Sequence, residues 1–263
     1  MKQLFEHMTR LDYDEVFNNL SIGHIFVCIA FVIGFIWMFR RSGDILKMPI
    51  FEAVEKVMVF VIIGAQGIYY YWYFVLGAGG DPYPLYICRI AGILICLTYF
   101  VHIKPLEDFS IMACIYGGIM AVFFSSPKPF AFPHITRWAY FTMHIGMTYV
   151  ALLRIVHYHR LIGKKELWNA LIVNTVAVIG VLITDIVMGW NYMFLMHIQL
   201  PDMPVLAALH VPDIINSTPW ITCPVAFIGY TFGTYAAWLF ASWMSRKALR
   251  MGFQVALEQA TDV

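Results

Sequence analysis

Charged residues are scarce in this chain of 263 residues. Asp, Glu, Lys and Arg make up 13% of the sequence and hydrophobic residues 61%, whereas an ordinary soluble domain has about 25% and 45–50%. So few charges could not cover the surface of a water-soluble fold of this size. The composition excludes a disordered chain and a nucleic-acid-binding protein. The formal net charge of +1 provides no steering of highly charged partners.

Several familiar signatures are also missing. The five cysteines include no CxxC pair and the histidines no HExxH spacing, so we expect no disulfide scaffold, no metal site and no cofactor. No secretory signal peptide is visible, because residues 1–19 carry four acidic residues and no cleavage site after an apolar core. We expect this segment at the membrane interface, either as a short helix or as a partly ordered tail.

What the chain does contain is long apolar runs, and its mean hydropathy is +0.72. Seven runs of about 20 residues, the length that spans a bilayer, cover Leu20–Phe39, Ala53–Leu76, Tyr83–Ile103, Phe109–Phe124, Arg137–Tyr158, Leu167–Trp190 and Pro219–Met244. They are continuous rather than alternating, which favours helices over a β-barrel. The prediction is an all-α polytopic membrane protein with seven transmembrane helices in residues 20–244 and a cytoplasmic tail in 245–263.

The cations predict the orientation of these helices. On one side lie Arg40, Arg41, Lys47, Lys104, Arg160, Lys164, Lys165, Arg246, Lys247 and Arg250, and on the other Lys2, Arg10, Lys128 and Arg137. Because Lys and Arg accumulate on the cytoplasmic side, we expect the N-terminus outside and the C-terminus inside. The fourth run is the shortest, and its small pair Gly117–Gly118 would let a neighbouring helix approach closely.

Cys88 is the cysteine whose sequence surroundings suggest a reactive thiol. It lies in Asp81-Pro-Tyr-Pro-Leu-Tyr-Ile-Cys-Arg, where Asp81 is expected as the N-cap and Pro82 as the first helical residue. Cys88 would then occupy roughly the second turn. The neighbouring Arg89 favours the thiolate, which is the nucleophilic form. The alternative is that Cys88 only packs and Arg89 extends toward water.

His144 is expected at a similar depth. At 1.5 Å per residue, Cys88 lies about 8–10 Å and His144 about 10–13 Å below the outer ends of their helices. The two side chains could meet if these two helices are neighbours, and a cysteine beside a histidine is the arrangement of an activated nucleophile. A buried histidine can equally serve a structural hydrogen bond.

Two further polar residues lie near the outer end of the sixth run. Asp185 either orients His144, as in a Cys-His-Asp arrangement, or pairs with Arg89 in a structural salt bridge. Asn191 either donates to a developing oxyanion or caps the helix.

Four short sequences together resemble a known family. They are Pro84-Leu-Tyr-Ile-Cys88, Phe132-Pro-His134, His144, and Gly189-Trp-Asn191-Tyr192-Met193. In their order and spacing the chain resembles the YwaF-like bacterial integral membrane proteins, which are similar to the animal transmembrane protein 164. The resemblance implies a bacterial plasma membrane protein and a lipid acyltransferase, with Cys88 and His144 as catalytic pair. Arg89 departs from the family, whose animal form has histidine there.

The function predicted is an acyltransferase, or acyl hydrolase, that acts on phospholipid acyl chains through a thioester on Cys88. Its partners would be membrane phospholipids and an acyl acceptor, with Arg89, Asp185, Asn191 and His134 supporting the site. The alternative is a non-enzymatic transporter or receptor, although the last run lacks the lysine that retinal would need. A third option is a haem held by His102 and His157. The oligomeric state is not predicted.

Overall fold

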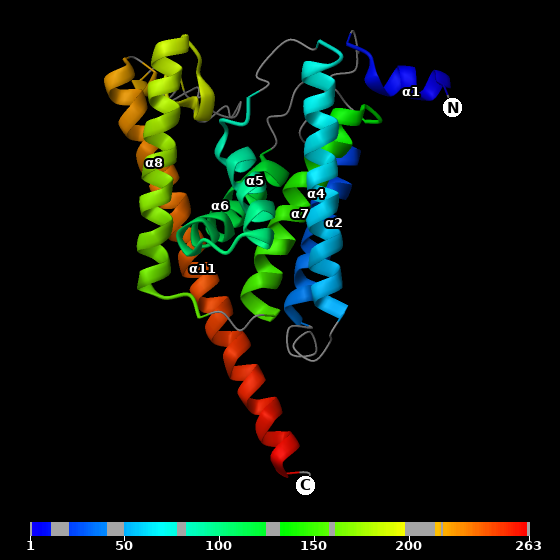
Figure 1. The fold of residues 1–263 in the computed structure, drawn as a ribbon, viewed down its shortest axis with the longest axis vertical. Helices are drawn as coiled ribbons and strands as arrows, with labels where there is room; N and C mark the ends of the chain where they lie inside the picture. Colours follow the sequence, from blue (N-terminus) through cyan, green and yellow to red (C-terminus); the bar gives the residue numbers. More distant parts are fainter. Residues whose placement is uncertain are drawn as a thin grey trace.

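The computed structural model describes residues 2–11, 21–40, 50–77, 83–124, 132–157, 161–197, 214–216 and 218–261. These residues form helices and no strands (Figure 1). The helices are α1 (Lys2–Thr9), α2 (Ile22–Arg40), α4 (Ile50–Phe74), α5 (Ile87–Phe100), α6 (Lys104–Phe123), α7 (Ile135–His157), α8 (Lys164–Met188), the 3₁₀ turn η1 (Tyr192–Phe194) and α11 (Pro219–Thr261). The all-α fold class is therefore confirmed.

Each of the seven apolar runs overlaps one long helix. Within the described residues, four helices, α6, α7, α8 and α11, are long and apolar enough to cross a membrane, and α2 and α5 contain shorter apolar segments. The number of seven spans and the orientation of the termini stay predictions. Helix α11 continues to Thr261, through most of the residues that we expected as a tail.

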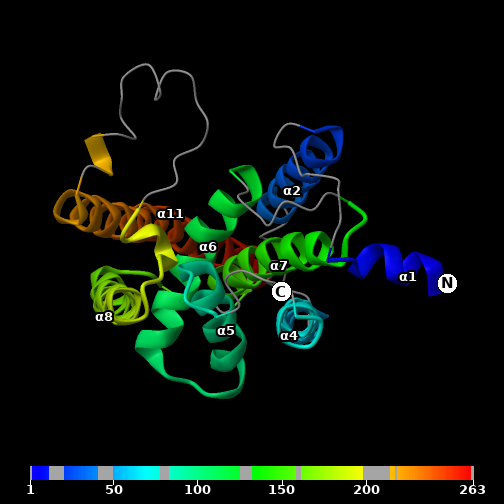
Figure 2. The same cartoon turned by 90° about the horizontal axis from the view of Figure 1, so that it is seen from above.

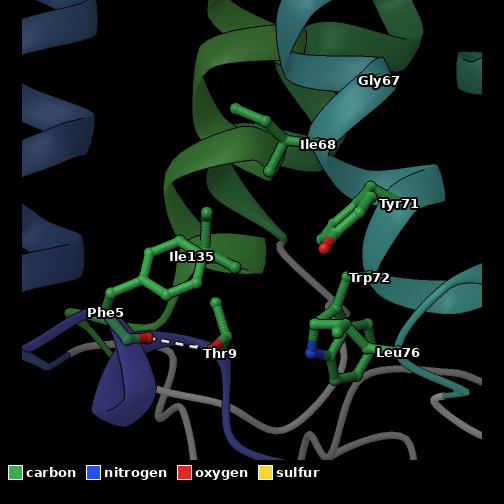
Figure 3. A pocket seen from close by; sticks show the side chains of 8 residues that line it. All are labelled: Phe5, Thr9, Gly67, Ile68, Tyr71, Trp72, Leu76 and Ile135. Atoms are coloured by element: carbon green, nitrogen blue, oxygen red, sulfur yellow. Dashed lines mark hydrogen bonds between the residues drawn. The ribbon is translucent and has the colours of Figure 1, made fainter. Parts of the chain in front are cut away.

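The N-terminal segment contains the short helix α1, which lies beside the end of α4 (Figures 1 and 3). Its Phe5 and Thr9, together with Tyr71 and Trp72 of α4 and Ile135 of α7, line an apolar pocket of about 290 Å³. Phe5 is nevertheless 57% exposed. A helix with exposed apolar side chains at the end of a membrane bundle is suited to the interface.

Helix α6 forms the centre of the molecule. It contacts α5, α7, α8, α11 and α2, and its residues 109–115 are all buried. Figure 2 shows α4 and α8 end-on and α6 from its side, so α6 runs across the bundle while those two run along it. The apolar sequence of α6 is thus enclosed largely by other helices.

The glycine pair of α6 sets the closest approach of its neighbours. A Cβ atom at Gly118 would collide with the Thr148 hydroxyl oxygen and would lie 2.9 Å from the carbonyl oxygen of His144, both on α7. The Thr148 hydroxyl donates to the carbonyl oxygen of Cys114, 3.1 Å away on α6. A Cβ atom at Gly117 would lie 3.6 Å from the Cβ of Cys88 on α5. The expected close approach at this pair is confirmed, and it involves two helices.

A buried ion pair joins α4, α5 and α7 at the end of the bundle away from α1. Arg154 Nε on α7 lies 2.7 Å from Glu55 Oε1 on α4, and the two side chains are 5% and 4% exposed. The same guanidinium donates to the Thr98 hydroxyl at 2.8 Å and to the Ile95 carbonyl at 2.9 Å, both on α5. Such a pair holds its partners together because removing one charge leaves the other buried and uncompensated.

The glycine contact leads to a first prediction. Gly118→Ala should destabilise the protein by about 1–3 kcal/mol, because the added methyl group must displace Thr148 and the backbone of α7. Gly117→Ala is the matched control and should change stability by less than about 1 kcal/mol, because its methyl group would make an ordinary contact. Unfolding of the two purified variants in detergent measures the difference. Equal stabilities would contradict this account of α6.

Candidate functional site

The predicted site residues gather around one end of the bundle. Cys88 is the second residue of α5, His144 lies within α7, and these two helices contact each other. Asp185 lies one turn before the end of α8, and His134 precedes the first residue of α7. The two helices are therefore neighbours, as the matched depths required, but no hydrogen bond joins Cys88 and His144, because His144 Nε2 has no partner among the described residues.

The start of α5 differs from the prediction. The helix begins at Ile87 with Tyr86 as its N-cap, so Cys88 lies in the first turn and not the second. Asp81 and Pro82 lie outside the described residues. Pro84 disfavours helical geometry at Tyr83, and the backbone of Tyr83 is satisfied by side chains: its N–H donates to the Tyr192 hydroxyl at 3.2 Å and its carbonyl accepts from Arg89 Nη1 at 2.9 Å.

The thiol of Cys88 lies on the face of α5 that meets α6 and α7. Its Cβ packs on Gly117. Gly92 lies one turn later on the same face. A Cβ atom added there would lie 3.6 Å from Met147 Sδ and 3.9 Å from Met143 Cγ on α7. Cys88 is a free, partly exposed cysteine. In the first helical turn, the positive end of the helix dipole favours a thiolate.

The imidazole of His144 is held with one nitrogen free. Its Nδ1 lies 2.7 Å from the Tyr140 carbonyl oxygen, and its ring packs 4.2 Å from the Tyr140 ring. A carbonyl oxygen only accepts, so Nδ1 carries the proton and Nε2 the lone pair. Nε2 is buried and has no hydrogen-bond partner among the described residues. Nε2 is therefore the ring atom of His144 that could accept a hydrogen bond or a proton.

A cysteine and a histidine that were not among the predicted site residues are in direct contact. Cys28 Sγ lies 3.4 Å from His24 Nε2, four residues away on α2. That nitrogen also lies 2.7 Å from the carbonyl oxygen of Val122. It must donate its proton there, so it cannot accept one from Cys28. The contact ties α2 to the end of α6, and the i, i+4 spacing of Cys28 and His24 is the signal that could have found it.

Arg89 is enclosed by tyrosines. Besides Tyr83, its guanidinium donates to the Tyr69 hydroxyl at 2.8 Å, and its Cζ lies 4.8 Å from the ring centroid of Tyr69 and 5.1 Å from that of Tyr86. Aromatic faces stabilise a cation in a desolvated place. The expected salt bridge between Arg89 and Asp185 is not formed.

The carboxylate of Asp185 supports a turn. It is 1% exposed, and its Oδ1 accepts the N–H of Tyr192 at 3.0 Å. Its Oδ2 is buried and without a hydrogen-bond partner among the described residues. The chain reverses at Gly189 (φ 68°), and Met193 and Phe194 also have positive φ values of 54° and 56°. Asp185 thereby holds a strained segment against the start of α5, where the rings of Tyr192 and Tyr86 are 5.1 Å apart.

Asn191 and His134 both organise backbone. Asn191 Oδ1 accepts the N–H groups of Met196 and His197, and its Nδ2 donates to the His197 carbonyl. Gly189, and not Asn191, caps α8. His134 is fully buried; its Nε2 lies 3.1 Å from the Arg10 carbonyl oxygen and its Nδ1 2.7 Å from the Thr136 hydroxyl. These contacts fix the N-terminal segment to the start of α7.

The haem option finds no support in these contacts. His102 lies 3.6 Å from the Glu107 carboxylate, and the side chain of His157 lies outside the described residues. Among the side chains that the structure describes, no three His, Cys, Asp or Glu groups are placed to hold a metal ion.

Comparison with known proteins gives one result. The model of the TMEM164 family matches residues 19–240, which include Cys88, His144, Asp185 and the turn after α8. No curated protein and no solved structure matches the chain.

Asp185 provides a second prediction. Asp185→Ala should destabilise the protein by about 1–3 kcal/mol, because the buried Tyr192 N–H loses its acceptor. Asp185→Asn keeps an oxygen in the same position and should retain most of that stability. Unfolding in detergent compares the two variants. If Asn is as damaging as Ala, the role of Asp185 depends on its charge and not on the hydrogen bond.

His134 provides a prediction on pH. Burial lowers the pKa of His134, so the folded protein favours the neutral ring relative to the unfolded chain, where the pKa is about 6.5. Its contribution to stability is then present above about pH 6.5 and is lost as pH falls through the lower folded-state pKa. The drop in unfolding temperature between pH 7.5 and pH 5 should be smaller in His134→Gln than in wild type. The same drop in both proteins would contradict this role.

Proposed function

Because this chain belongs to the TMEM164 family of membrane proteins, we propose that it is an acyltransferase, or acyl hydrolase, that acts on phospholipid acyl chains. Cys88 is the nucleophile and His144 the general base. The observation that carries the proposal is the state of His144: its Nδ1 is fixed by the Tyr140 carbonyl and its Nε2 has no partner among the described residues, on a helix that contacts the one bearing Cys88.

The first half of the reaction forms the acyl-enzyme. His144 Nε2 accepts the proton of the Cys88 thiol, and Sγ attacks the carbonyl carbon of the ester. The tetrahedral intermediate collapses with cleavage of the bond between that carbon and the alcohol oxygen. The imidazolium returns its proton to this oxygen, which releases a lysolipid and leaves a thioester on Cys88.

Backbone N–H groups of α5 can stabilise the oxyanion of the intermediate. The first N–H groups of a helix have no acceptor within the helix. In α5 the first backbone N–H groups with a described carbonyl acceptor are those of Arg89 and Ile90, which both donate to the Tyr86 carbonyl. The N–H of Cys88 has no described backbone acceptor and faces its own sulfur, so it is near the reacting atoms at the end of the helix that favours negative charge. Asn191 is less suited to this role, because its amide is engaged in the turn after α8.

The second half transfers the acyl group. His144 accepts a proton from an acceptor alcohol, or from water, and the resulting oxygen nucleophile attacks the thioester carbonyl. The carbon–sulfur bond breaks, and Cys88 leaves as a thiolate that regains the proton. Burial disfavours the Cys88 thiolate, and the charge of Arg89 offsets part of this cost in both halves, whereas Asp185 and His134 act on backbone geometry.

Trapping the thioester tests the proposal. Purified protein in detergent is incubated with a phospholipid that carries a radiolabelled acyl chain, and protein-bound label is measured before and after neutral hydroxylamine. Wild type should acquire a hydroxylamine-labile label. Cys88→Ser should lose it, and His144→Ala should form it about 10²–10⁴-fold more slowly.

Cys223→Ser is the matched control, because Cys223 is also a free, partly exposed cysteine; this variant should label like wild type. Folded wild-type protein that never acquires label from several lipid classes would favour the transporter or receptor alternative. Labelling that survives in Cys88→Ser and disappears in Cys223→Ser would show that the nucleophile is Cys223 on α11 and that the assignment to Cys88 is wrong.

A further inference from the structure

A second polar region lies at the other end of the bundle, away from Cys88. The buried pair Glu55–Arg154 forms one wall of a pocket of about 550 Å³, which Thr98, His102, Lys104 and Glu107 also line. Thr98 is ten residues after Cys88 on α5, which corresponds to about 15 Å along the helix axis. The pocket is therefore separate from the proposed acyl-transfer site.

Arg154 has hydrogen-bonding capacity left on this wall. A guanidinium carries five N–H donors. Three are used, by Glu55, Thr98 and the Ile95 carbonyl; the other two have no acceptor among the described residues. Because buried donors without an acceptor are costly, the pocket is prepared for an added oxygen atom.

The pocket lining carries two carboxylates and two cations, so its ligand can bear at most a single negative charge. Glu55 is paired with Arg154, and Glu107 lies 3.6 Å from His102. Lys104 is exposed and forms no ion pair or hydrogen bond within the described residues. As the first residue of α6 it also opposes the helix dipole, and a residue that breaks a local rule is often retained for function. With two acidic groups nearby, a multiply charged anion is disfavoured.

The surroundings of the pocket are apolar and exposed. Phe60 of α4 and Leu97 and Phe100 of α5 are 51%, 42% and 57% exposed, and the rings of Phe60 and Phe100 are 6.3 Å apart. In a membrane protein, such side chains face lipid chains. A ligand of this pocket can therefore place its polar group against Arg154 and Lys104 and its chains against these residues.

We propose that this pocket binds the phosphodiester head group of a membrane lipid. Arg154 donates its two remaining N–H groups to phosphate oxygens, Lys104 supplies the second cation, and Phe60, Leu97 and Phe100 contact the acyl chains. The site is independent of the chemistry proposed for Cys88 and would retain a lipid even in a protein without that activity.

Binding by the purified full-length protein in detergent tests the site. The unfolding temperature is measured during titration with dioctanoylphosphatidylcholine, with dioctanoylglycerol, which has the same chains and no phosphate, and with inorganic phosphate. The phospholipid should raise the unfolding temperature with saturation, and the other two should bind at least tenfold more weakly.

Variants locate the effect. Lys104→Gln should weaken phospholipid binding about tenfold or more, because a charge-assisted hydrogen bond is lost. Lys165→Gln removes an exposed lysine at the start of α8 that does not line the pocket, and should bind like wild type. Arg154→Lys keeps a cation beside Glu55 and loses the spare N–H groups, so it should also bind more weakly, while its unfolding temperature without ligand reports its folding.

Three results would overturn the proposal. Equal binding of dioctanoylglycerol would reduce the site to apolar contacts. Unchanged affinity for the phospholipid in Lys104→Gln would show that the phosphate does not bind beside Lys104. Inorganic phosphate that binds as tightly as the phospholipid, and is lost in Lys104→Gln, would assign the pocket to soluble phosphate in place of lipid.

Discussion

The arrangement of the whole molecule depends on how closely two helices can approach α6. Gly117 and Gly118 provide no side chains at the crossing, so α5 rests on one and α7 on the other. Gly117 packs against the Cα and Cβ atoms of Cys88, and Gly118 packs against the carbonyl oxygen of His144. The separation between α5, which bears Cys88, and α7, which bears His144, is therefore set by two α6 positions that have no side chain. A central helix with larger residues at this crossing would push the two apart.

Three buried arginines show different ways to accommodate a charge inside a helical membrane protein. Arg154 meets a carboxylate and two oxygen acceptors on other helices. Arg89 lies among tyrosine rings and donates to a hydroxyl and a carbonyl. Arg137 lies 5.8 Å from the ring centroids of both Tyr140 and Phe141. The first arrangement joins helices, whereas the other two place cations around the end where Cys88 and His144 lie.

The sequence was sufficient for what depends on local pattern. Continuous apolar runs predicted every long helix, and counting residues along helices brought Cys88 and His144 to one end of the bundle. It was insufficient where distant residues decide. The first turn of α5 begins late because Tyr192, more than 100 residues away, satisfies the backbone of Tyr83. Asp185 holds a backbone N–H in place of a cation, and the Glu55–Arg154 pair joins residues that no periodicity connects.

The length of helix α11 can be compared directly with the thickness of a bilayer. Its 43 residues correspond to about 65 Å at 1.5 Å per residue, about twice the hydrocarbon thickness of a bilayer. At tilts of up to about 40°, a helix of this length that crosses a bilayer extends at least about 20 Å beyond the hydrocarbon layer, and Figure 1 shows its C-terminal part projecting beyond the other helices. Arg246, Lys247 and Arg250 follow its apolar part, which is the point at which a helix that crosses a bilayer would leave the hydrocarbon.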